Sequence, residues 1–172
     1  MKLREGYFFQ RRWQRLLVWG LLLGVASLIF ALSAQDGGQS SVLTDGIAQG
    51  VVRFFDDGYS ARSPEAQQAI LEFAARIIRK MGHFCEYALL ACLTRFLLEG
   101  YRWPHPSGCA WLICTLYAIT DECHQLFVNA RYGTVRDVLV DSAGAATGVL
   151  FAFVVLTLAA RWQLNRSPKE RS

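Results

Sequence analysis

Four long apolar runs alternate with polar segments along the chain. They cover residues 16–34, 81–98, 107–128 and 138–160. A helix needs about 20 mostly apolar residues to cross a bilayer. The third run reaches that length only when Asp121 and Glu122 are included near its end. The pattern predicts an all-α membrane protein with four transmembrane helices in a single domain, residues 1–172. A signal peptide is the competing interpretation of the first run, but its apolar part is long and its cleavage site is poor, which favours a retained span.

The polar segment 35–80 has two parts. Its first part, "QDGGQSSVLTDG", is predicted to be a turn-rich linker. Its second part has Ser63 at a capping position and Pro64 at the first helical position, which predicts a helix from there. Apolar residues follow on one stripe of that helix, namely Ile70, Phe73, Ile77 and Met81. We expect an amphipathic helix that lies on the outer membrane surface or over the protein's own outer face, with a bend at Gly82 into the second span.

Charge is distributed unevenly between the two sides of the predicted membrane. The chain has 172 residues, of which 53% are hydrophobic and 19% charged, with a net charge of +4. Its bases are concentrated in the tails 1–15 and 161–172, which flank the first and last runs. The positive-inside rule therefore predicts two cytoplasmic tails, an even number of spans and an outer segment 35–80. Bases placed in this way predict the lipid bilayer as a partner and no nucleic acid.

Polar and ionisable residues concentrate at the predicted outer ends of three spans. We call these residues the outer cluster: Lys80, His83, Glu86, Tyr87, Asp121, Glu122, Gln125, Arg131, Asp137 and Asp141. Helical spacing places His83, Glu86 and Tyr87 on one face, and Asp121 and Gln125 share another. Because ionisable groups are costly in contact with lipid, these side chains are expected to point into the bundle.

The outer cluster has several interpretations. It could only pin helix ends together through ion pairs, or it could bind a ligand. It could also catalyse a reaction, with His83, Asp121 and Glu122 as the acid and base candidates. A metal site that also uses Glu86 and His124 is conceivable, but no HExxH or CxxC pattern supports it, so no metal and no cofactor are expected.

Two glycines continue the polar stripe of the fourth span. Asp137, Asp141, Gly144 and Gly148 follow one another at helical spacing, and "GAATG" is a motif of small residues that allows a second helix to approach closely. We expect Gly144 and Gly148 to pack against another helix, either within the bundle or in a second copy that would form a homo-oligomer.

Several segments resemble the VanZ-like family of small bacterial multi-pass membrane proteins. They are "IFALSAQ", "GHFCEYALL", "DECHQ" and "RYGTVRDVLVDSAGAATG". The matching positions are Ser33, Lys80, His83, Phe84, Tyr87, Asp121, Glu122, Gln125, Arg131, Gly133, Asp137, Asp141, Gly144 and Gly148. The chain departs from the family at Asn129-Ala130, where a proline often precedes the loop arginine, and at Asp141, where Asn is frequent.

The resemblance implies a protein of the bacterial cell membrane. It implies either low-level resistance to teicoplanin-type lipoglycopeptides, without remodelling of the peptidoglycan target, or a general role in the cell envelope. The outer cluster would then bind a lipid headgroup, a lipid-linked precursor or a lipoglycopeptide. The alternative is a membrane-embedded enzyme that uses a carboxylate and His83 on a lipid or lipid-linked substrate. We favour the binding role. The sequence contains no nucleophile elbow and no phosphate loop.

Overall fold

The computed structural model describes residues 11–35, 37–128 and 133–166. Within these ranges the fold is entirely helical and contains no strand. The elements are α1 (Arg12–Ser33), α2 (Gly37–Phe55), the short 3-10 helix η1 (Tyr59–Ala61), α3 (Pro64–Gly100), α4 (Pro106–Gln125) and α5 (Val135–Arg166). The prediction of an all-α fold is confirmed for this part of the chain.

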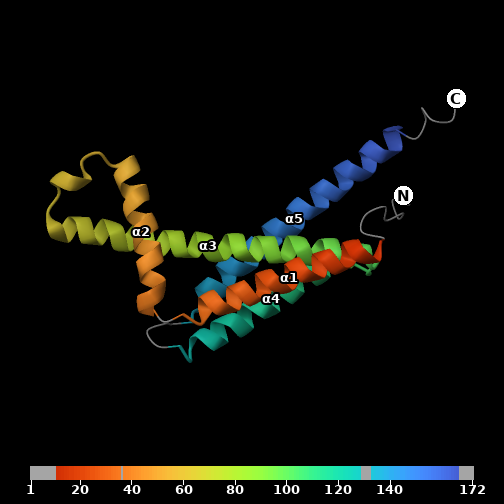
Figure 1. The fold of residues 1–172 in the computed structure, drawn as a ribbon, viewed down its shortest axis with the longest axis horizontal. Helices are drawn as coiled ribbons and strands as arrows, with labels where there is room; N and C mark the ends of the chain where they lie inside the picture. The colour runs from red at the N-terminus through yellow and green to blue at the C-terminus, as the bar shows by residue number, and fades with distance from the viewer. Residues whose placement is uncertain (1–10, 36, 129–132, 167–172) are drawn as a thin grey trace.

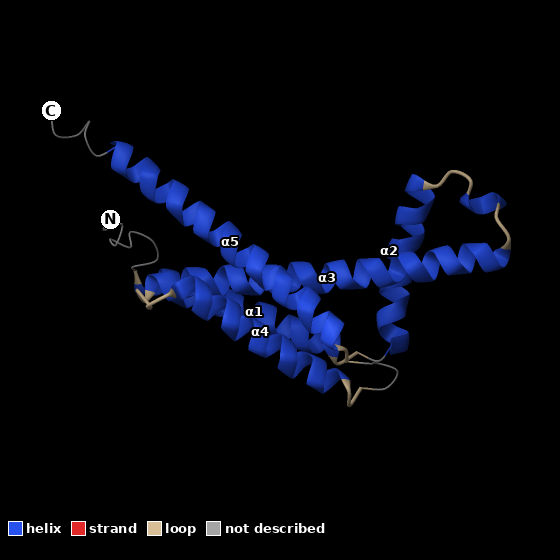
Figure 2. Cartoon of the chain, turned by 180° about the vertical axis from the view of Figure 1, so that it is seen from behind, coloured by secondary structure: helices blue, strands red, loops and turns tan. Residues whose placement is uncertain are grey.

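Helix α3 is the axis on which the other helices pack. Helices α1, α4 and α5 lie along its second half, and α2 crosses its first half (Figure 1). Figure 2, from behind, shows that α1 begins and α5 ends towards the same end of the molecule. The core lies where α1, α3, α4 and α5 meet, and its buried members are Ile29, Tyr87, Leu90, Ala91, Ala110, Cys114, Ala118, Ala145 and Val149. Small residues predominate among them, so the helix axes can approach closely.

The two glycines of α5 face α3 of the same chain. A side chain at Gly144 would meet the backbone of Phe84, and one at Gly148 would meet the backbone of Ala88. Within the described chain, α3 therefore occupies the glycine face of α5. A homo-oligomer formed through these glycines would have to displace α3.

The linker predicted at residues 35–46 is wrong for most of its length. Residues 37–55 form α2 instead. Ala48 and Val52, one turn apart, are buried where this helix packs on α3. The Gly and Ser residues that indicated turns are outweighed by this tertiary contact, since packing of an apolar face stabilises helices more than local propensity does.

The bend predicted at Gly82 is also absent from the described chain. Helix α3 runs without interruption for 37 residues from Pro64 to Gly100. Its start is as predicted, because the Ser63 hydroxyl accepts a hydrogen bond from the Ala66 amide at 3.4 Å. A single glycine inside a helix costs only about 1 kcal/mol relative to Ala, which the contacts on both sides of Gly82 offset.

Two described helices, rather than the four predicted, are long and apolar enough to cross a membrane by themselves. They are Arg12–Ser33 and Val135–Gln163. The second half of α3 and the whole of α4 fall short, because polar residues such as Arg95, Asp121 and Glu122 lower their apolarity. The predicted third span already depended on including Asp121 and Glu122. Many large apolar side chains of α1 and α5 are exposed, among them Leu16, Leu17, Leu150, Phe151 and Leu158. Such a surface is typical of contact with lipid.

Candidate functional site

Four helices bring polar residues together at one end of the bundle. Ser33 ends α1, Tyr87 lies in the middle of α3, Asp121 is near the end of α4, and Asp141 is in the second turn of α5. These side chains are buried, with exposed fractions of 0%, 0%, 3% and 1% respectively. The first and last of these residues, Ser33 and Asp141, are more than 100 positions apart in the sequence, so only the packing of the bundle assembles the group.

A hydrogen-bond network joins α1 to α4. The Ser33 hydroxyl donates to Asp121 Oδ2 at 2.8 Å, and the Gln125 amide donates to the same oxygen at 3.3 Å. The Gln125 amide also lies 3.4 Å from the Ser33 oxygen. One oxygen of Asp121 therefore receives two donors, while its other oxygen, Oδ1, is buried without a hydrogen-bond partner among the described residues.

Asp141 and Tyr87 lie beside this network. Both carboxylate oxygens of Asp141 and the hydroxyl of Tyr87 are buried and have no hydrogen-bond partner within the described ranges. Asp121 and Glu122 are electrostatic neighbours of both residues. Buried polar groups are rarely left without partners, because each one costs free energy when removed from water. The Asp141 carboxylate can therefore take up a proton or accept hydrogen bonds from a ligand, and the Tyr87 hydroxyl can form a hydrogen bond with a ligand.

A partly open rim covers the buried residues. Lys80 of α3 forms an ion pair with Asp137 of α5 at 2.5 Å, and their side chains are 48% and 29% exposed. The Thr134 hydroxyl donates to Asp137 Oδ2 at 2.7 Å, and the Thr134 backbone amide donates to Glu122 Oε2 at 2.9 Å. The rim thus ties α3, α4 and α5 together near the surface, where an exposed ion pair contributes little to stability.

The loop before α5 approaches α4 very closely. A Cβ at Gly133 would lie 3.2 Å from the carbonyl carbon of Glu122 and 3.3 Å from its Oε2. Only a residue without a side chain allows the following Thr134 amide to reach Glu122. Arg131, a predicted member of the outer cluster, lies outside the described residues. Arg136, in the first turn of α5, is exposed.

The remaining members of the outer cluster lie between rim and interior. His83 and Glu86 are half-buried. His83 is an electrostatic neighbour of Asp137, and Glu86 of Asp141. The Nδ1 atom of His83 is buried and has no hydrogen-bond partner among the residues described. In the same ranges, no group of three or more His, Cys, Asp and Glu side chains could hold a metal ion.

Comparison with known proteins identifies the family. A model of the VanZ/LLP1 family matches residues 18–157, which is most of the chain. The chain belongs to the VanZ/LLP1 family. No curated protein and no solved structure matches it. Every residue of the outer cluster and both packing glycines fall within the region that matches the VanZ/LLP1 model, so the resemblance noted in the separate motifs is confirmed over one continuous segment.

Two further residues of this VanZ/LLP1 chain belong to the site, although the sequence did not assign them to the outer cluster. Ser33 contributes the α1 donor to Asp121, and Thr134 holds both Asp137 and Glu122. A signal for Thr134 exists in the sequence, because "TVRD" is a capping pattern in which Thr precedes an acidic residue by three positions. The Asp137 amide indeed donates to the Thr134 hydroxyl at 3.2 Å. Ser33 was among the positions that match the family, but its contact with Asp121, 88 residues away, follows only from the packing of the bundle.

Proposed function

We propose that the chain is a multi-pass protein of the bacterial cell membrane in which the second half of α3 and the whole of α4 cross the bilayer together with α1 and α5. The outward surface of α4 is apolar, because Leu112, Ile113, Leu116 and Ile119 are exposed. Its acids point the other way: Asp121 and Glu122 are 3% and 6% exposed. The charges that lower the apolarity of α4 would therefore not meet lipid.

Helix α3 also keeps a charged side chain of its second half away from lipid. Arg95 is 6% exposed and forms an ion pair with Glu99 at 2.6 Å, while its Nε donates to the Ser107 hydroxyl at 3.0 Å. A paired and hydrogen-bonded charge inside a bundle is tolerated in a membrane. With both basic tails in the cytoplasm, the end of the bundle that carries the outer cluster faces outwards.

In this position, we propose that the outer cluster binds the polar group of an amphiphile. The class includes a lipid headgroup, a lipid-linked precursor of the envelope and a lipoglycopeptide. The observation that carries the proposal is Asp141, which is 1% exposed, has no hydrogen-bond partner among the described residues, and lies beside the unpartnered hydroxyl of Tyr87. A ligand that donates hydrogen bonds from an ammonium or hydroxyl group would satisfy both.

The charge of the described site favours a zwitterionic or hydroxyl-rich group. The carboxylates of Asp121 and Asp141 lie buried in the interior of the site, whereas the Lys80 ammonium is engaged at the rim by Asp137. Binding at this site would link the chain to the family role in resistance to teicoplanin-type lipoglycopeptides or to a general role in the envelope. The partly open rim would admit the polar group, and the apolar tail would remain in the surrounding bilayer.

The test is the susceptibility of a Gram-positive host to teicoplanin and vancomycin at matched membrane levels of each variant. The wild type should protect against teicoplanin selectively. Asp141→Ala and Tyr87→Phe should remove most of the protection, whereas Asp57→Asn, on an exposed loop, should retain it. If the wild type gives no protection, the resistance role is refuted. Growth of the same strains under detergent stress then tests the envelope role, which requires the wild type to differ from Asp141→Ala.

The alternative function is an enzyme with Asp121 or Glu122 as base and His83 as acid. His83 has Asp137 of the rim as an electrostatic neighbour, and Asp121 accepts hydrogen bonds from Ser33 and Gln125. Asp121→Asn separates the two functions, because it keeps the size of the side chain and removes its basicity. Partial protection by this variant supports binding, and complete loss at normal protein level supports catalysis by Asp121.

A further inference from the structure

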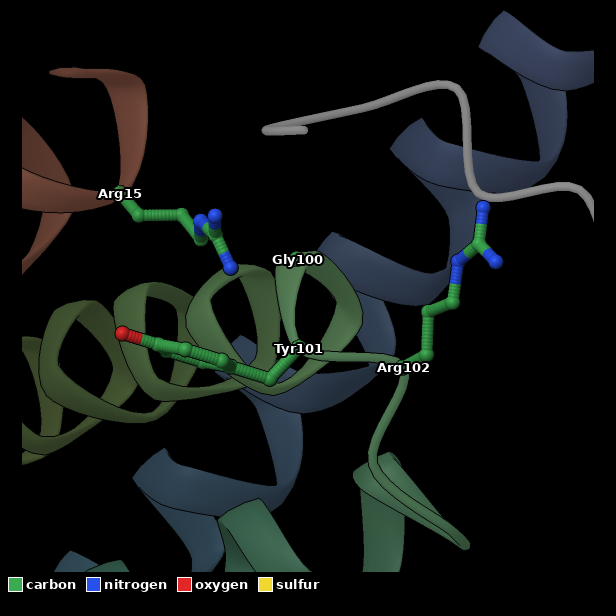
Figure 3. A pocket seen from close by; sticks show the side chains of 4 residues that line it. All are labelled: Arg15, Gly100, Tyr101 and Arg102. Carbon is green, nitrogen blue, oxygen red and sulfur yellow. The ribbon is translucent and has the colours of Figure 1, made fainter. Parts of the chain in front are cut away.

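A second polar site lies at the other end of the bundle, far from the outer cluster. It is a surface hollow of about 300 Å³ lined by Arg15, Gly100, Tyr101 and Arg102. Figure 3 shows Arg15 reaching from α1 over the ring of Tyr101, while Arg102 extends from the other side of the turn that follows α3. Two guanidinium groups therefore flank one opening.

The positive charge of this hollow is not neutralised within the described part of the chain. Neither Arg15 nor Arg102 forms an ion pair there, and the nearby carboxylate of Glu99 is paired with Arg95 at 2.6 Å. The Arg15 guanidinium lies 5.0 Å from the centre of the Tyr101 ring, and the Trp19 indole donates to the Tyr101 hydroxyl at 3.2 Å. Stacking and hydrogen bonding thus hold one side of the hollow in place before any ligand binds.

Arg102 adopts a backbone conformation that normally favours glycine. Its φ angle is 54°, in the left-handed region, two residues after α3 ends at Gly100. The strain of a residue with a side chain in this region is about 1 kcal/mol. Glycine would end the helix without this strain, so the presence of arginine points to a use for its side chain.

Aromatic residues place the hollow at the level of the lipid headgroups. Tyr101 and its hydrogen-bond partner Trp19 are exposed, as are Trp13 and Trp103, which lie within two positions of Arg15 and Arg102 in the sequence. Trp and Tyr are enriched at the boundary between the hydrocarbon and the water. The exposed apolar surface of α1 begins immediately after Arg15, with Leu16 at 70% and Leu17 at 57%. The guanidinium groups thus lie next to the first apolar turn, where lipid phosphates are found.

We propose that this hollow binds the phosphate of an anionic phospholipid, with Arg15 and Arg102 as its ligands. Arginine pairs with phosphate through two parallel N–H groups, and basic pockets between membrane helices recognise anionic headgroups. The inference goes beyond the proposed role of the outer cluster but rests on the membrane insertion proposed with it. If the tails are cytoplasmic, the lipid is in the inner leaflet and anchors the end of the bundle at which α1 begins.

The experiment measures the phosphatidylglycerol and phosphatidylcholine that the purified protein retains in mild detergent, by native mass spectrometry at equal lipid concentrations. The wild type should retain phosphatidylglycerol preferentially. Arg15→Gln and Arg102→Gly should each weaken this binding about fivefold. Arg102→Gly relieves the strained backbone, so its folding should be intact, which thermal unfolding verifies. Arg76→Gln, at an exposed position of the first half of α3, is the matched control and should bind like the wild type.

Each other outcome overturns the proposal. Equal retention of the two lipids by the wild type refutes the site, as does a loss in Arg76→Gln as large as that in Arg102→Gly. Complete displacement of phosphatidylglycerol by excess inorganic phosphate would reassign the hollow to a soluble phosphate. Failure of the protein to float with vesicles of any composition refutes membrane insertion and hence the proposed function as well. Insertion without a headgroup preference refutes the hollow alone.

Discussion

Replacement of Gly148 by alanine tests the close packing of α5 on α3. A Cβ at this position would lie 2.7 Å from the carbonyl carbon of Ala88 and 2.9 Å from its Cα. Ordinary contacts of a Cβ begin at 3.4 Å, so α5 has to retreat from α3 by more than half an ångström. The opposing atoms belong to the backbone, and no side-chain rotation can relieve the clash.

The expected cost follows from the effect of overfilling a packed interface. Insertion of one methyl group into such an interface typically destabilises a protein by about 1–3 kcal/mol. Displacement of α5 would also loosen its neighbours Ala145 and Val149, which are buried in the core. We therefore expect Gly148→Ala to lower the free energy of unfolding by about 2 kcal/mol.

The measurement is reversible unfolding in mixed micelles of a mild detergent and dodecyl sulfate, followed by tryptophan fluorescence. Gly24→Ala is the matched control, because it adds the same methyl group to a helix where nothing lies within 4 Å of the new Cβ. It should leave stability unchanged or raise it by up to about 1 kcal/mol, since alanine is the better helix former. If the two variants differ by less than about 0.5 kcal/mol, the close contact between α5 and α3 is refuted.

Two further predictions concern single hydroxyl groups. Ser33→Ala removes one of the two donors to Asp121 and should lower the free energy of unfolding by about 1–2 kcal/mol. Ser60→Ala, at an exposed position, is the control and should have no effect in the same unfolding assay. Equal effects of the two substitutions would exclude a contribution of the hydrogen-bond network around Asp121 to stability. In the outer segment, the amide of Glu65 and the Ser63 hydroxyl hold the pKa of the Glu65 carboxyl below its usual range. This contribution to stability is present above the unfolded pKa and is lost as the pH falls through the folded one. Ser63→Ala should raise the pKa of Glu65, as a carbon-detected NMR titration would show, and an unchanged titration would contradict the hydrogen bond between the Ser63 hydroxyl and the Glu65 carboxyl.

The sequence predicted the polar end of the bundle more accurately than the outer segment. Asp121 and Gln125 were expected on one helical face, and they share a hydrogen bond at 3.3 Å. The stripe on α5 was expected to turn its glycines towards another helix, and Gly148 lies against Ala88. Both predictions depend on spacing within one helix, which is a local property. The linker at 35–46 failed because Gly and Ser indicate turns only when no partner surface compensates for their weak helix propensity.

The amino-acid sequence by itself determines that the chain is helical and that its polar residues collect at the ends of apolar runs, because run length and helical periodicity depend only on neighbouring residues. It also carries the motifs that place the chain in the VanZ/LLP1 family. The tertiary structure alone decides that Lys80 pairs with Asp137, 57 residues away, and that Asp141 is buried with no hydrogen-bond partner among the described residues. It also brings Arg15 and Arg102 to opposite sides of one hollow. Burial and pairing are relations between distant segments, which exist only after α1, α3, α4 and α5 have packed together.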